Sequence, residues 1–191
     1  MKPQPAGILL AAGKGLRFDP SGAQDKLTQL LPQGDSVATA SARHLLSVLP
    51  VVLAVVRPGA DLLAAQLREA GCTVAVCPTA EQGMGATLVF ALSQMREADG
   101  WVIALADMPY VQAATLGMLV GALRQGADIA LPVYQGRRGN PVAFSRKHLP
   151  QLLALGGDQG ARGLIKAHPV TEVAVDDAGV VRDIDTAADL A

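Results

Sequence analysis

Short apolar runs alternate with amphipathic stretches along most of this sequence, and that alternation limits the possible folds more than any other feature. Segment 51–56 (VVLAVV) is a continuous, largely β-branched run, which is typical of a strand buried on both faces of a sheet. Segment 61–70 has helical spacing and ends at Gly71, a residue type that commonly terminates helices. Alternation at this spacing predicts right-handed βαβ units and a mainly parallel sheet covered by helices.

The same pattern predicts the other elements of an α/β fold. Strands are expected at 7–12, 51–56, 73–77, 101–105 and 128–133, with helices at 36–49, 61–70, 85–97 and 113–125. Shorter elements follow, with strands at 142–144, 170–175 and 181–184 and helices at 146–155 and 158–167. No linker long enough to separate two domains is found, so we expect residues 1–191 to form a single domain.

Composition excludes several classes of protein. Hydrophobic residues make up 50% of the chain, but its longest apolar run is about nine residues, whereas a membrane-spanning helix needs about 20. A net charge of -1, 3% aromatic residues and the lack of a Lys/Arg cluster argue against binding to nucleic acid. Cys72 and Cys77 are interpreted as buried apolar residues, and the N-terminal MKPQPAG lacks the apolar core of a signal peptide. We therefore expect a cytoplasmic protein that does not associate with membranes.

The loop after the first predicted strand has the composition of a phosphate-binding loop. Ligands of a parallel sheet bind beyond the carboxyl ends of its strands. Here glycines offer backbone N–H groups, small residues permit close approach, and three cations supply positive charge. These candidate nucleotide-binding residues are Leu10, Ala11, Ala12, Gly13, Lys14, Gly15, Arg17 and Lys26. The loop matches neither the Walker pattern nor the full dinucleotide fingerprint, so an ordinary glycine turn is the alternative.

Two further loops carry candidate ligand residues. Asp107 ends a buried strand, where a carboxylate needs a partner, and Asp185 follows another apolar segment; together they could hold Mg²⁺. Helix capping is the alternative role for these carboxylates. Gly83, Met84 and Gly85 precede or open a helix whose N-terminal amides can bind a nucleotide, although a plain glycine cap explains them equally well.

A turn-rich basic segment lies later in the chain. YQGRRGNPVAF carries Arg137, Arg138 and Asn140, which could bind a second, anionic substrate. The alternative is a solvated surface turn.

Together these motifs resemble the MobA-like NTP transferases over nearly the whole chain, in particular the molybdenum cofactor cytidylyltransferase branch. The matching segments occur in the family's order: LAAGKGLRF with Lys26, GMGATL, LADMP, GRRGNPVAF, GGDQGAR and DIDTAADL. The resemblance implies a Rossmann-like three-layer α/β/α sandwich with a mainly parallel, mixed seven-stranded sheet. It also implies Mg²⁺-dependent transfer of a nucleoside monophosphate, most simply CMP from CTP, to a molybdopterin-type cofactor with release of pyrophosphate.

The resemblance also implies a role for each motif residue. By position, Lys26, Arg17 and Asp107 are catalytic, Gly13 and Gly15 bind the triphosphate, residues 83–85 lie near the base and ribose, and Asp107 and Asp185 ligate Mg²⁺. The acceptor is expected to contact Arg137, Arg138, Asn140, Asp158 and Arg162. A transient contact with a molybdoenzyme or its chaperone is a further implied interaction.

The sequence departs from the family pattern at three places. Asn140 stands where the family usually has His, Asp19 where it usually has Gly, and the loop between Arg17 and Lys26 is longer. These departures leave open a guanylyltransferase that uses GTP for the same cofactor and a sugar- or alditol-phosphate nucleotidyltransferase. A non-catalytic protein that binds and delivers the cofactor is an alternative of another class.

Overall fold

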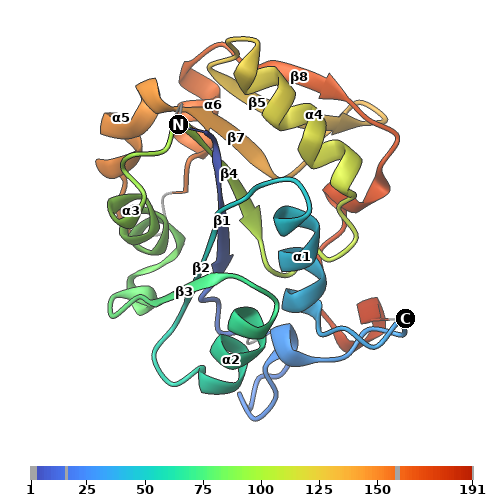
Figure 1. The fold of residues 1–191 in the computed structure, drawn as a ribbon. Coiled ribbons are helices and arrows are strands. Elements are labelled where there is room, and N and C mark those ends of the chain that lie inside the picture. Colours follow the sequence, from blue (N-terminus) through green and yellow to red (C-terminus); the bar gives the residue numbers. More distant parts are fainter. Residues whose placement is uncertain (1–3, 16, 158–159, 191) are drawn as a thin grey trace.

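The computed structural model describes residues 4–15, 17–157 and 160–190, and a mixed sheet runs through them (Figure 1). Its eight strands follow the order β3-β2-β1-β4-β7-β5-β6, and β8 also pairs with β5. The strands are β1 (Ala6–Ala11), β2 (Val52–Val56), β3 (Thr73–Val76), β4 (Gly100–Leu105), β5 (Ile129–Tyr134), β6 (Arg137–Arg138), β7 (Val142–Ser145) and β8 (Thr171–Ala174).

The strand directions confirm the expected mainly parallel, mixed sheet. β1 pairs in parallel with β2 and β4, β2 with β3, and β5 with β8. Only β7, which lies antiparallel between β4 and β5, and the short β6 run in the opposite direction. The two-residue β6, which the sequence pattern does not predict, raises the number of strands to eight from the seven implied by the family resemblance.

Helices cover both faces of the sheet (Figure 1). Buried residues of α1, α2 and α4 form one core cluster with the sheet, and those of α3 and α5 form the other. The helices are α1 (Val37–Leu46), α2 (Asp61–Glu69), α3 (Met84–Gln94), α4 (Ala113–Arg124), α5 (Leu149–Leu153) and α6 (Arg162–Ala167). Short 3₁₀ turns lie at η1 (Lys26–Thr28), η2 (Ala80–Gln82), η3 (Arg146–His148), η4 (Ala178–Val181) and η5 (Ala187–Leu190).

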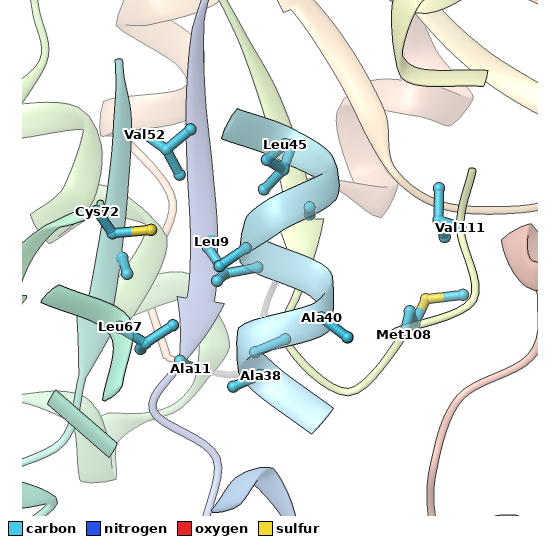
Figure 2. Packing of buried hydrophobic residues seen from close by; sticks show 14 of the residues in the cluster. Leu9, Ala11, Ala38, Ala40, Leu45, Val52, Leu67, Cys72, Met108 and Val111 are labelled. Atoms are coloured by element: carbon cyan, nitrogen blue, oxygen red, sulfur yellow. The ribbon is translucent and has the colours of Figure 1, made fainter. Parts of the chain in front are cut away.

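Alternating side chains of the central strand β1 contribute to both cores. Leu9 belongs to the cluster under α1, whereas Ile8 belongs to the cluster under α3, as the two-residue period of a strand requires. Figure 2 shows Leu9 beneath α1, whose small residues Ala38 and Ala40 let the helix approach the sheet closely. β1 is thereby fixed from both faces, and so is the position at which the loop after it begins.

The predicted strand at 181–184 is wrong. The chain there forms η4 and then an extended segment without ladder partners among the described residues. The buried carboxylate of Asp177 accepts hydrogen bonds from the N–H groups of Gln112 and Gly179 and from the Thr115 hydroxyl, at 2.6–2.9 Å. Since Ile184 N also donates to Asp107 O at 2.8 Å, contacts with the β4–α4 connection replace those of a strand.

Two predicted helices are shorter than expected. The span 146–155 divides into η3 and α5, with Pro150 in the first turn of α5, where its missing N–H is tolerated. The span 158–167 is helical only over Arg162–Ala167 among its described residues.

As predicted, both cysteines are buried and free. None of the helices in the described part of the chain has the length and apolar character needed to cross a membrane.

Candidate active site

A cleft of about 510 Å³ opens where β1 and β4 end. It is the edge at which ligands of parallel sheets bind. The lining brings together residues of the first loop, the η2–α3 connection, the end of β4 and the C-terminal tail: Leu10, Ala12, Gly13, Lys14, Gly15, Arg17, Phe18, Lys26, Leu27, Ala80, Glu81, Gly83, Met84, Thr87, Leu105, Asp107 and Asp185. Segments far apart in the sequence therefore share one cavity.

Lys26 lies at the centre of the charges in this cleft. Its Nζ donates to Asp107 Oδ2 at 2.7 Å and to the Ile184 carbonyl at 2.8 Å, and it lies 3.5 Å from Asp185 Oδ1. Only 11% of its side chain is exposed. A sheltered ammonium group needs such partners, because its loss of hydration would otherwise be unfavourable.

The tail reaches the cleft through backbone and charged contacts. The hydrogen bond from Ile184 N to the Asp107 carbonyl fixes the tail beside the end of β4. Asp185, one residue further on, also accepts from Arg17 Nη1 at 2.6 Å. Because 80% of the Arg17 side chain is exposed, this second pair is hydrated and free to exchange for a ligand.

Three carboxylates converge at this point. Asp107, Asp183 and Asp185 each offer an oxygen atom, and these atoms lie within 4.8 Å of one another. Carboxylate oxygens are the ligands that Mg²⁺ and Mn²⁺ prefer, so the group can bind a divalent cation. Asp183 is not among the predicted metal ligands. The sequence feature that could have identified Asp183 as a ligand is its i, i+2 spacing to Asp185, which places both side chains on one side of an extended segment.

Gly15 permits the loop and Lys26 to approach each other. Its φ of +63° lies in the left-handed region, and a Cβ there would come 3.3 Å from Lys26 Cγ. A side chain at this position would be strained and would press on Lys26. The glycine thus allows the turn to form directly over the buried lysine.

Asp19 shapes the longer part of the loop. Its carboxylate accepts hydrogen bonds from the Ser21 hydroxyl at 2.6 Å and from the N–H groups of Gln24 and Ser21 at 2.7 and 2.9 Å. The Ser21 hydroxyl first, and then these amides, hold the pKa of Asp19 below its ordinary value. The carboxylate at this atypical position therefore organises a local turn.

The η2–α3 connection supplies another wall of the cleft. α3 begins at Met84, and Gly83 precedes it with a φ of 112°. Both residues line the cleft, but Gly85 does not, and its N–H group donates to the Gly157 carbonyl at 2.9 Å. Ala11 also lies outside the lining, buried at the end of β1. These two are the predicted nucleotide-binding residues that the structure does not bring to the cleft.

A second cavity of about 340 Å³ adjoins the first through Leu10, Met84 and Leu105. Its polar lining residues are Asn140 and Arg162, and the rest is apolar apart from Gly160. Two of the predicted acceptor residues therefore lie together.

The remaining predicted acceptor residues lie elsewhere. Arg137 and Arg138 are exposed on β6 outside both linings, and Arg138 Nε donates to Glu172 Oε1 at 2.7 Å. The structure does not bring these two arginines to either cavity. Asp158 lies outside the described residues.

The MobA-like NTP transferase domain matches residues 7–173, which include all but the tail of this site. The chain belongs to this family. It is a nucleotidyltransferase, and the family implies an NTP and a small phosphorylated acceptor as its substrates.

Known proteins are similar to this chain over nearly its whole length. Purine catabolism protein PucB of Bacillus subtilis is 32% identical over an alignment that covers 94% of this chain and 91% of PucB. The crystal structure of Rv0371c from Mycobacterium tuberculosis is 28% identical with a TM-score of 0.85, covering 99% of this chain and 96% of that one. The Rv0371c complex with manganese is 29% identical with a TM-score of 0.79, covering 97% and 95%.

A more distant structure shares the fold. A nucleotidyl transferase from Methanothermobacter is 20% identical with a TM-score of 0.81, covering 97% of this chain and 94% of that one.

Proposed function

We propose that this nucleotidyltransferase transfers CMP from CTP to a phosphate group of a molybdopterin-type molybdenum cofactor and releases pyrophosphate. The observation that carries the proposal is the position of Lys26, whose buried ammonium links Asp107 and Asp185 beneath the Gly13–Gly15 turn. Phosphate-binding amides, cations and metal-binding carboxylates meet there in one cleft. Nucleotidyl transfer needs this combination, because negative charge builds up on the leaving pyrophosphate.

Each part of the cleft has a role in this proposal. Gly13, Lys14 and Gly15 bind the β- and γ-phosphates, and Lys26 and Arg17 neutralise the charge of the leaving group. Glu81, Gly83, Met84 and Thr87 border the base and ribose. Asp107, Asp183 and Asp185 would hold Mg²⁺, which when bound would supply positive charge against the phosphates.

The second cavity receives the acceptor. Arg162 can pair with the acceptor phosphate, Asn140 can hydrogen-bond to it or to the ring, and Phe144 and Ile165 offer apolar surface to a ring system.

In the proposed reaction, an acceptor oxygen attacks the α-phosphorus while the bond between the α-phosphorus and the bridging oxygen breaks, and pyrophosphate leaves. The attacking phosphate is already an anion, so no general base is required. In agreement, no histidine lines either cavity within the described residues.

A pyrophosphate-release assay tests the substrates of this proposal. Each of the four NTPs is incubated with Mg²⁺, with and without molybdenum cofactor, using wild-type protein. We expect release from CTP that depends on the acceptor. If GTP is the only NTP that supports release, the nucleotide substrate is GTP and not CTP. If release occurs only with sugar or alditol phosphates, the proposed acceptor is wrong. If no NTP supports release with any of these acceptors while the cofactor binds, the protein is a binder that delivers the cofactor.

Localisation and contacts belong to the same proposal. We infer a cytoplasmic enzyme that passes its product to a molybdoenzyme or to the chaperone of that enzyme.

A further inference from the structure

Arg57 connects the two ends of the nucleotide loop although it is not among the described residues that line the cleft. It follows β2 directly, and the last residue of β2, Val56, pairs with Ala11 at the end of β1. Because β1 and β2 are neighbours in the sheet (Figure 1), this register brings Arg57 to the point at which the loop leaves the sheet.

The guanidinium group makes one hydrogen bond to each end of the loop. Nη1 donates to the Gly13 carbonyl at 2.9 Å, and Nη2 donates to Asp25 Oδ2 at 2.8 Å. Only 26% of the Arg57 side chain and 19% of that of Asp25 are exposed. Water therefore competes less with these bonds than with those of an ordinary surface ion pair.

At Gly13, the hydrogen bond fixes the orientation of a peptide group. The carbonyl of one residue and the N–H group of the next point in opposite directions across a trans peptide. Since the Gly13 carbonyl is directed at Arg57, the N–H group of Lys14 is directed away from it. Both Gly13 and Lys14 line the cleft. Arg57 thereby limits the rotation of an amide that the phosphate-binding turn needs.

At Asp25, the hydrogen bond fixes the start of η1. While Oδ2 is held by Arg57, Oδ1 accepts from Leu27 N at 3.0 Å and caps the turn. The Asp25 carbonyl also accepts from Thr28 Oγ1 and Gln29 Nε2, at 2.9 and 3.0 Å. Because Lys26 is the first residue of η1, the orientation of Asp25 helps to set where the Lys26 ammonium lies.

We propose that Arg57 is a positioning residue that holds the nucleotide loop in its binding conformation by tying Gly13 and Asp25 to the end of β2. It acts through these two residues and touches no substrate. Without it, the intervening loop is free to sample conformations that must be given up when the nucleotide binds. The proposal rests on the nucleotide binding proposed for the cleft, and Arg57 lies outside the LAAGKGLRF motif and Lys26.

Direct measurement of nucleotide affinity tests this role. Arg57→Met removes both hydrogen bonds while keeping much of the side-chain volume. We expect it to raise the Kd for CTP with Mg²⁺, measured by calorimetry, by at least about tenfold, as expected for the loss of charge-assisted hydrogen bonds. The KM for the acceptor should change less than twofold. Arg57→Lys keeps the charge but lacks the two donor nitrogens of the guanidinium group, so its affinity for CTP should lie between those of Arg57→Met and the wild type.

Controls separate positioning from stability and from failure of the proposed function. Arg43→Met removes another arginine–aspartate pair, in which Nη1 of Arg43 on α1 donates to both carboxylate oxygens of Asp35; Arg43 lies outside the cleft, so this variant should leave the Kd for CTP unchanged. If Arg57→Met does not fold, Arg57→Lys and Asp25→Asn carry the same expectation of weaker CTP binding. A Kd within twofold of wild type in the folded variants would overturn the role of Arg57. Absence of NTP binding by the wild-type protein would instead overturn the proposed function.

Discussion

Lys26 neutralises the carboxylates at which the metal is proposed to bind. Its ammonium group lies 2.7 Å from Asp107 Oδ2 and 3.5 Å from Asp185 Oδ1. An incoming divalent cation would be repelled by this charge until Lys26 turns to the phosphates of a nucleotide. Free metal should therefore bind weakly, and metal with nucleotide should bind well.

The variant Lys26→Met separates the effect of the ammonium group on metal binding from its effect on turnover. Removing the ammonium should increase the affinity of the nucleotide-free protein for Mn²⁺ by about tenfold, because the carboxylates lose their internal counter-ion. The same variant should lose at least about a hundredfold in turnover, since a group that stabilises the leaving pyrophosphate is gone. Titration with Mn²⁺ followed by electron paramagnetic resonance measures the first effect. Unchanged or weaker Mn²⁺ binding would contradict the counter-ion role.

At the scale of elements, the tail is held to the rest of the fold by close backbone packing. A Cβ on Gly179 in η4 would lie 2.1 Å from the Tyr110 carbonyl oxygen, an approach that no rotation of a side chain can relieve. η4 precedes the segment that carries Asp183 and Asp185. The packing of one glycine thus helps to place the carboxylates at which the metal is proposed to bind.

Substitution of Gly179 tests this packing. We expect Gly179→Ala to lower the free energy of unfolding by at least about 2 kcal/mol, because η4 and the backbone at Tyr110 must separate. Gly121→Ala in α4 is a matched control, since no heavy atom lies within 4 Å of its added Cβ. The control should be neutral or stabilising by up to about 1 kcal/mol, because alanine favours helix. Equal urea midpoints for the two variants would rule out the packing argument.

The sequence predicts elements well where local pattern and burial agree. The continuous apolar run at 51–56 matches β2 (Val52–Val56) closely, since that strand is buried along its whole length. The expected strand at 181–184 fails because contacts with Asp107, rather than a neighbouring strand, take up the backbone hydrogen bond of Ile184. Arg57 was not predicted for a related reason. Its contribution to the site depends on contacts with Gly13 and Asp25, which are distant in sequence and which no local spacing reveals.

At the scale of the whole molecule, buried polar atoms without hydrogen-bond partners among the described residues are found beside the core cluster that includes residues of α3 and α5. His148 is buried, and neither of its ring nitrogens has a hydrogen-bond partner within the described residues. Burial first, and then the charges of His168 and Lys147, lower its pKa from the ordinary value near 6.5, while Asp128 acts in the opposite sense. The folded protein therefore binds the proton of His148 less readily than the unfolded chain.

This shift predicts how stability depends on pH. A histidine whose pKa is lowered by folding contributes stability above its unfolded pKa, and that contribution is lost as the pH falls through about 6.5 towards the folded value. The free energy of unfolding should therefore decrease between pH 7.5 and 5.5. His148→Leu should reduce that decrease, as measured by urea unfolding at both pH values. A variant with the same pH dependence as the wild type would show that His148 is not responsible.

The scarce charges of the chain are concentrated where the chemistry is proposed. Only 17% of residues are charged, yet Arg17, Lys26, Asp107 and Asp185 meet in one cleft beyond the strand ends. The sequence predicted this group, because each residue follows an apolar strand or lies in a glycine-rich loop. Which base and which acceptor fill the two cavities depends on shape and contacts that residue types alone do not specify.

Transfer of label from [α-³²P]CTP to the acceptor measures the proposed reaction itself. In a single turnover with Mg²⁺ and molybdenum cofactor, the wild-type protein should move the label to the cofactor. The variant Asp107→Ala should move almost none, because a proposed metal ligand and the partner of Lys26 are removed. Label that remains in CTP or appears only as free CMP with the wild-type protein, or equal transfer by Asp107→Ala, would contradict the account.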